Sequence, residues 1–126
     1  MKKEFKIKKC TKCGAIVKVI EDCKCEECKI QCCGEQMKEL IPNSVDAAIE
    51  KHVPTYEVKD GMLYIKVNHV MEDEHFIEWI TVVAENEEKT SYFAPGEEAT
   101  VTYKYQPGTT IYAYCNKHGL WKVDVK

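Results

Sequence analysis

The sequence has no long apolar run, no excess of basic residues and no repeated or low-complexity segment. No run approaches the roughly 20 apolar residues of a membrane-spanning helix, so we expect no membrane partner. The N-terminus, MKKEFKIKKC, is positively charged but lacks the apolar core of a secretory signal. A net charge of −3 gives no sign of nucleic-acid binding. Together these absences favour a cytoplasmic location, where thiols stay reduced.

The cysteines are distributed very unevenly. Seven of the eight lie before residue 34, and residues 1–40 contain no histidine, proline or tryptophan. A segment this short buries too little apolar surface to fold alone and needs a metal or disulfides. Because clustered cysteines in a reducing compartment more often bind metal, we predict a small metal-bound domain at residues 1–40. A second domain then occupies residues 41–126.

The second domain is expected to begin with a connector, residues 41–54. One helical turn is predicted at residues 45–49, with Asn43 or Ser44 as its N-terminal cap. Pro54 should stop any helix.

From Thr55 onward the pattern is typical of antiparallel β-structure. Asp60-Gly61 separates two alternating runs, which is a strong hairpin signal. Pro-Gly pairs at 95–96 and 107–108 indicate further turns. About seven short strands predict an immunoglobulin-like antiparallel β-sandwich. The whole chain is therefore expected to be mostly β, with the small cysteine-rich domain preceding the sandwich.

The early cysteines contain the pattern of a metal knuckle. Cys10 and Cys13 are spaced C-x-x-C and followed by glycine, so that backbone amides can donate to sulfur. Two later pairs could complete a four-sulfur site: Cys32 with Cys33, and Cys25 with Cys28. Iron and zinc both suit four thiolates, and the spacing does not choose between them. A disulfide-stapled knot is the alternative.

The four histidines and the last cysteine all lie at the ends of predicted strands or in the connections between them: His52, His69, His75, Cys115 and His118. Connections at one end of a sandwich converge, so these side chains could meet there. The C-x-x-H spacing of Cys115 and His118 lets both bind one metal from one turn. From the residues alone, a joint metal site and separate surface or core histidines both stay open. A Cys115–His118 nucleophile pair is the weaker alternative.

A joint site would have five protein ligands, one more than the closed tetrahedron of structural zinc. Imidazoles with one thiolate suit iron, copper or nickel. The sixth octahedral position would be left for a small substrate, and a thiolate opposite it would push electron density through the metal. The resulting hypothesis is redox chemistry on a small oxygen species.

Five separated stretches form a distinctive set: IKKCTKCGAIV, QCCGEQMKEL, VDAAIEKHVP, HVMEDEHFIEWI and YAYCNKHGLWK. Together, and in this order, they resemble the superoxide reductase family, in particular its two-centre desulfoferrodoxins. The resemblance implies a desulforedoxin-like head at residues 1–40 and a neelaredoxin-like, immunoglobulin-like domain at 41–126. The head would bind iron, or zinc in recombinant protein, through four thiolates: Cys10, Cys13, Cys32 and Cys33.

The resemblance also implies roles in the second domain. A catalytic non-haem iron would have four equatorial imidazoles and one axial thiolate: His52, His69, His75, His118 and Cys115. Glu50 would be the sixth ligand in the ferric state, and Lys51 would draw in the anionic substrate. The implied activity is reduction of superoxide to hydrogen peroxide without dioxygen production, by a homodimer that receives electrons from a small donor such as rubredoxin. The alternatives are an electron-transfer iron protein and a structural metalloprotein.

The chain departs from the family pattern in two places. Val70 stands where the family usually has proline after the histidine, which should loosen that loop. The segment EDCKCEEC adds three cysteines that the family usually lacks: Cys23, Cys25 and Cys28. They compete for the head metal, but the match of QCCGEQM to the family favours the adjacent pair Cys32–Cys33.

Overall fold

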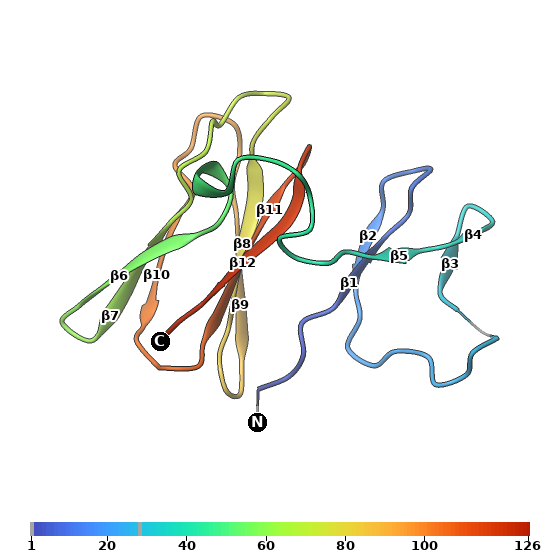
Figure 1. Cartoon of the computed structure of the whole chain (residues 1–126), viewed down its shortest axis with the longest axis horizontal. Helices are drawn as coiled ribbons and strands as arrows, with labels where there is room; N and C mark the ends of the chain where they lie inside the picture. The colour runs from blue at the N-terminus through green and yellow to red at the C-terminus, as the bar shows by residue number, and fades with distance from the viewer. Residues whose placement is uncertain (1, 28) are drawn as a thin grey trace. The chain divides into compact units, whose positions relative to one another are not determined.

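The computed structural model describes residues 2–27 and 29–126 of the chain. The chain divides into two compact units: Glu4–Ile41 forms one, and Pro42–Lys126 with residues 2–3 forms the other. Nearly all of the regular structure in both is antiparallel β (Figure 1). The predicted fold class is confirmed: a cysteine-rich β-unit is followed by an antiparallel sandwich. Within the described residues, no helix has the length and apolar character needed to cross a membrane.

The cysteine-rich unit has very short strands. One sheet has the order β2-β1-β5, from Ile16–Lys18, Ile7–Lys9 and Lys38–Glu39, and a separate hairpin pairs β3 (Gln31–Cys32) with β4 (Glu35–Gln36). The buried apolar side chains among its described residues are Ile7, Cys10, Val19 and Met37. So small a core cannot hold a unit of this size without further cross-links.

The second unit is a sandwich of two antiparallel sheets. The first has the order β10-β7-β6, from Thr100–Lys104, Met62–Lys66 and Thr55–Lys59. The second has the order β12-β11-β8-β9, from Gly119–Asp124, Thr110–Cys115, Ile77–Val83 and Glu88–Tyr92. These seven strands match the number expected from the spacing of the turn signals.

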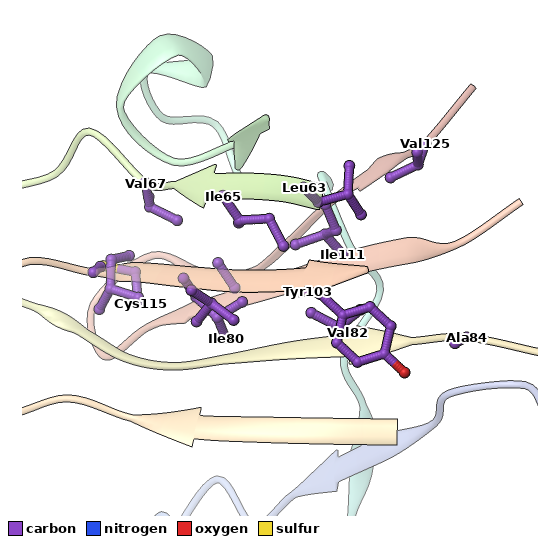
Figure 2. Close-up of a cluster of buried hydrophobic side chains, with 14 residues drawn as sticks. Leu63, Ile65, Val67, Ile80, Val82, Ala84, Tyr103, Ile111, Cys115 and Val125 are labelled. Carbon is purple, nitrogen blue, oxygen red and sulfur yellow. The ribbon is translucent and has the colours of Figure 1, made fainter. Parts of the chain in front are cut away.

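The core of the sandwich lies between the two sheets. Figure 2 shows apolar side chains of both sheets pointing toward one another, among them Leu63 and Ile65 of β7 and Ile80 of β8. All three are at most 2% exposed. Cys115, the last residue of β11, belongs to the same buried cluster. The Cys115 thiol is therefore surrounded by the apolar side chains of the core.

The predicted hairpin at Asp60-Gly61 is confirmed. It joins β6 to β7 with two residues, and their φ angles are 51° and 76°. Positive φ at both positions is the type I′ turn that matches the twist of the flanking strands.

The predicted helical turn in the connector is wrong in position. The connector instead contains a 3₁₀ turn, η1, at Ile49–Lys51, and no side chain caps its N-terminus. Asn43 is not a cap because its amide pairs with the edge of β12: Nδ2 donates to Lys122 O (3.2 Å) and Oδ1 accepts from Lys122 N–H (2.8 Å). The turn is instead closed by His52, whose N–H donates to Ile49 O at 3.1 Å.

Candidate metal centres

The sandwich brings together five potential ligand atoms, all within 4.8 Å of one another, from His52, His69, His75, Cys115 and His118. His52 Nε2 lies 3.1 Å from His118 Nδ1, and Cys115 Sγ lies 3.4 Å from His69 Nε2. Two nitrogens bound at right angles to one metal, each about 2.1 Å from it, are about 3 Å apart. The separation of the two imidazoles therefore fits neighbouring ligands of a single ion.

Cys115 is directed into the site by the register of its strand. The inward row of β11 runs Ile111, Ala113, Cys115, and each is 0% exposed. The pairing of β11 with β8 shifts at the end of this row, because Tyr114 pairs with Trp79 but Cys115 pairs with Ile77. Such bulges re-aim side chains beside functional sites.

His118 lies in the short loop that joins β11 to β12. Cys115 and Gly119 close this loop as a strand pair, leaving three residues between them. Gly119 has φ +81°, the left-handed conformation that three-residue hairpin loops require. The C-x-x-H spacing thus returns His118 Nδ1 to within 3.9 Å of Cys115 Sγ.

Two of the histidines are oriented by hydrogen bonds to backbone carbonyls. His52 Nδ1 is 2.7 Å from Ala48 O, and His69 Nδ1 is 2.5 Å from Val70 O. A carbonyl only accepts, so each Nδ1 carries the proton and each Nε2 keeps a lone pair for a metal. Within the described residues, Nε2 of His75 is buried without a hydrogen-bond partner. A bound cation would give a buried nitrogen of this kind its partner.

The surroundings favour the neutral form of two of these imidazoles. Burial lowers the pKa of His69 and outweighs the hydrogen bond to Val70 O, which raises it. Burial likewise lowers the pKa of His75, with His118 adding to the effect. Only neutral imidazole ligates a metal, so the electrostatics fit the donor set.

Trp121 packs directly against this site. Its ring stacks on His52 with centroids 4.9 Å apart and planes at 25°, and its Nε1–H donates to His118 O at 3.0 Å. The indole is 1% exposed. It therefore shields one side of the site from water, as a metal-covering residue would.

A pocket of about 530 Å³ opens onto the imidazoles, and Lys51, Asp46 and Glu72 are among its lining residues. Glu50, on the same turn as Lys51, is exposed and is not among the lining side chains described for this pocket. Its part as a sixth ligand stays a prediction. A hollow of about 720 Å³ over β6, β7 and β10 is lined by no histidine or cysteine, so it offers a metal no soft ligand.

In the cysteine-rich unit, the four thiols predicted from the sequence also meet, all within 4.8 Å of one another: Cys10, Cys13, Cys32 and Cys33. Cys13 N–H lies 3.5 Å from Cys10 Sγ, which is the amide-to-sulfur contact expected of the knuckle. Cys13 Sγ is 3.6 Å from Cys32 Sγ. Cys33, at φ 54°, turns the chain so that adjacent cysteines both face the group.

The thiols cannot all ionise by themselves. Hydrogen bonds from the amides of Cys13 and Lys12 lower the pKa of Cys10 to about 6. Contact with Cys13 raises the pKa of Cys32 to about 12 and also raises that of Cys33. Four thiolates at this spacing need a cation to offset their charge, and a tetrahedral thiolate-bound metal supplies it.

Two of the three extra cysteines lie within the described residues. Cys23 and Cys25 do not belong to the four-thiol group, and Cys28 lies outside the described residues. Asp22 accepts a hydrogen bond from Cys23 N–H (2.8 Å) and pairs with Lys8 (3.0 Å). The Cys23 backbone is therefore held by an ion-paired carboxylate.

Comparison with known proteins supports a family assignment. The Desulfoferrodoxin family model matches residues 44–124. The chain is 37% identical to the desulfoferrodoxin of Syntrophotalea carbinolica, over 98% of this chain and 99% of that protein. It is 36% identical to the desulfoferrodoxin of Desulfarculus baarsii over the same shares. The chain belongs to the desulfoferrodoxin family, as the five motifs predicted.

A solved structure agrees with the fold. The superoxide reductase of Treponema pallidum matches with a TM-score of 0.70, covering 96% of this chain and 99% of that chain. The two sequences are 23% identical, so this likeness concerns the fold alone.

Proposed function

We propose that the chain is a superoxide reductase acting at a non-haem iron bound by the four histidines and Cys115. The reaction takes one superoxide, one electron and two protons to one hydrogen peroxide, and it releases no dioxygen. The observation that carries the proposal is the five-ligand set, walled by Trp121 and the core but open to a pocket lined by Lys51. Membership of the desulfoferrodoxin family and the fold of a superoxide reductase support it.

The residues around the site have separate tasks. When bound, iron would supply one-electron redox chemistry and a coordination position for a small ligand. Bound to the iron as a thiolate, the buried Cys115 would favour donation of electron density to the metal. His52 and His69 hold their ligand nitrogens in place through the carbonyls of Ala48 and Val70. Trp121 excludes water from one side.

Lys51 supplies the local positive charge that an anionic substrate requires. The chain as a whole carries −3, and the pocket lining includes the carboxylates of Asp46 and Glu72. Lys51 carries the positive charge of this lining, so attraction of an anion to the pocket would depend on Lys51. We assign Glu50, one residue away, the role of sixth ligand in the ferric state.

The cysteine-rich unit completes the proposal. We infer that residues 1–40 bind a second iron, or zinc in recombinant protein, through their four gathered thiols. Residues 41–126 then form the catalytic domain. A small one-electron donor such as rubredoxin would supply the electrons, and the working form would be a cytoplasmic homodimer.

The proposal is tested by mixing the reduced protein with a known amount of superoxide. We expect one superoxide consumed and one hydrogen peroxide formed per catalytic iron, with no dioxygen evolved. Dioxygen evolution would indicate dismutation instead. If superoxide is not consumed although two irons are bound, the chain is an electron-transfer protein. If the bound metal is zinc and nothing reacts, it is a structural metalloprotein.

Replacing Lys51 by alanine should slow the reaction with superoxide roughly tenfold at low ionic strength, because a steering charge is lost. The dependence of the rate on salt should weaken, and the metal content should stay the same. Stopped-flow kinetics over a range of salt concentrations measures both effects. Lys59→Ala, an exposed lysine on β6, is the matched control. Equal rates in the wild type and Lys51→Ala would remove Lys51 from the mechanism.

A further inference from the structure

Asn116 occupies an unusual place between two ligand-bearing segments. It follows Cys115 directly and begins the three-residue loop that contains His118. Its side chain contacts the segment just before β8, some forty residues earlier in the chain. This segment contains His75.

The side-chain amide of Asn116 holds the backbone on both sides of His75. Its Oδ1 accepts from Phe76 N–H at 3.0 Å, and its Nδ2 donates to Glu74 O at 2.9 Å. Its own backbone N–H donates to Phe76 O at 3.3 Å. The amide thus pairs with this segment as a neighbouring strand would.

The rest of the backbone near His75 is held by a tight turn. Glu72 N–H donates to His75 O at 3.0 Å, and His75 N–H donates to Glu72 O at 3.1 Å. From the carbonyl of Glu74 to that of Phe76, every backbone polar group is therefore hydrogen-bonded. Three of these five bonds are made by Asn116.

His75 depends on this backbone more than the other histidines do. His52 and His69 are each oriented by a bond from ring Nδ1 to a carbonyl. Within the described residues, the ring of His75 makes no such bond, and its buried Nε2 has no partner. Its ring contacts are with other members of the ligand set, His69 at 4.6 Å and His118 at 5.1 Å between centroids. The direction of the imidazole is thus determined largely by its main chain.

We propose that Asn116 is a positioning residue that aims His75 at the metal and couples this imidazole to the Cys115 thiolate. The inference rests on the proposed metal site. Asparagine suits the task because one planar group offers both a donor and an acceptor. Aspartate keeps the shape and the bond from Phe76 N–H but loses the donor to Glu74 O. Alanine loses both bonds.

The test uses the full-length, iron-loaded protein and its Asn116→Ala and Asn116→Asp variants. The measurements are the rate of iron release from the sandwich to a chelator and the thiolate-to-iron absorption band of the oxidised site. Residues that orient ligands typically contribute about 10- to 100-fold to metal affinity, so we expect iron release to be about 10- to 100-fold faster. We also expect the absorption band to shift, while the spectrum of the head metal stays unchanged.

Leu63→Ala is the control for general destabilisation. Leu63 is 0% exposed and lies toward the other end of the core cluster from Cys115 (Figure 2). The Leu63→Ala substitution should leave the thiolate-to-iron absorption band unchanged. Unchanged release and absorption in Asn116→Ala would overturn the proposal, as would the same band shift in Leu63→Ala. If Asn116→Ala does not fold, the isosteric Asn116→Asp decides by the same criteria.

Failure of the proposed function would look different, because neither measurement uses superoxide. If the Asn116 variants release iron faster but the wild-type protein does not react with superoxide, the positioning role of Asn116 is supported and the proposed reductase activity is refuted. A wild-type sandwich that holds no iron would refute the metal site, and the role of Asn116 with it.

Discussion

Substitution of Cys115 by serine should abolish both the visible thiolate-to-iron absorption of the oxidised sandwich and the reduction of superoxide. The absorption requires a sulfur-to-metal bond, which serine cannot form. Serine also stays protonated near neutral pH, so the anionic ligand that favours electron transfer is lost. Substitutions of residues that merely orient ligands already reduce metal affinity or activity about 10- to 100-fold. Loss of a ligand should exceed this range.

The position of Cys115 strengthens this expectation. The thiol ends a fully buried apolar row and lies 3.4 Å from His69 Nε2, so its sulfur is placed beside the other candidate ligands. Absorption spectra, metal analysis and superoxide kinetics measure the effect. Cys23→Ser is the matched control, since it removes a thiol that belongs to neither ligand group. A Cys115→Ser protein that keeps both its absorption and its activity would refute the ligand assignment.

Loss of the head metal should unfold Glu4–Ile41 while the sandwich stays folded. Structural zinc contributes an apparent 10–16 kcal/mol or so to small metal-bound domains. The strands of this unit are two or three residues long, and its described apolar core is limited to Ile7, Cys10, Val19 and Met37. Without a metal, the crowded thiols would also lose the cation that offsets their charge.

Cys32→Ser is the direct test, read by amide hydrogen exchange in the full-length protein. Protection should disappear from β1 and β2 and persist in β8 and β11, the central strands of the larger sheet. Serine at Cys23, Cys25 and Cys28 together is the control, and it should leave both metal and protection in place. Protection of β1 and β2 in metal-free Cys32→Ser would show that other interactions hold the unit. Loss of the metal in the triple variant would show that the ligand set is misassigned.

Local patterns were enough to predict most of the fold. The turn at Asp60-Gly61 needs positive φ at both residues, and the alternation of β7 depends only on neighbours in sequence. The connector was different because its turn depends on tertiary contacts. Asn43 is engaged by β12, and His52 closes the turn through Ile49 O and Ala48 O. Helix and turn propensities do not predict such tertiary hydrogen bonds.

The candidate ligands were less fully determined by local pattern. The residue types and strand-end positions of the histidines and Cys115 left both a joint site and separate side chains open, and the family resemblance joined them in one ligand set. Residues that support them carry no such signal. Asn116 is an ordinary loop residue until Glu74 and Phe76 are seen beside it. The only hint was that an asparagine, able to pair like a peptide, directly followed Cys115.

If the proposed function holds, the connector links metal binding to substrate attraction. Within residues 41–51 no side chain is buried, and His52 is the first that is. Holding a backbone residue in one conformation costs about 1–2 kcal/mol, so the order of this exposed stretch depends on its anchors. Asn43 fixes one end of it and His52 the other.

A metal that binds His52 therefore also stabilises the conformation in which Lys51 lines the pocket. In the proposed reductase, the same linkage means that loss of the metal weakens the electrostatic attraction of Lys51 for superoxide. Metal-loaded molecules would then attract the anion more strongly than metal-free ones.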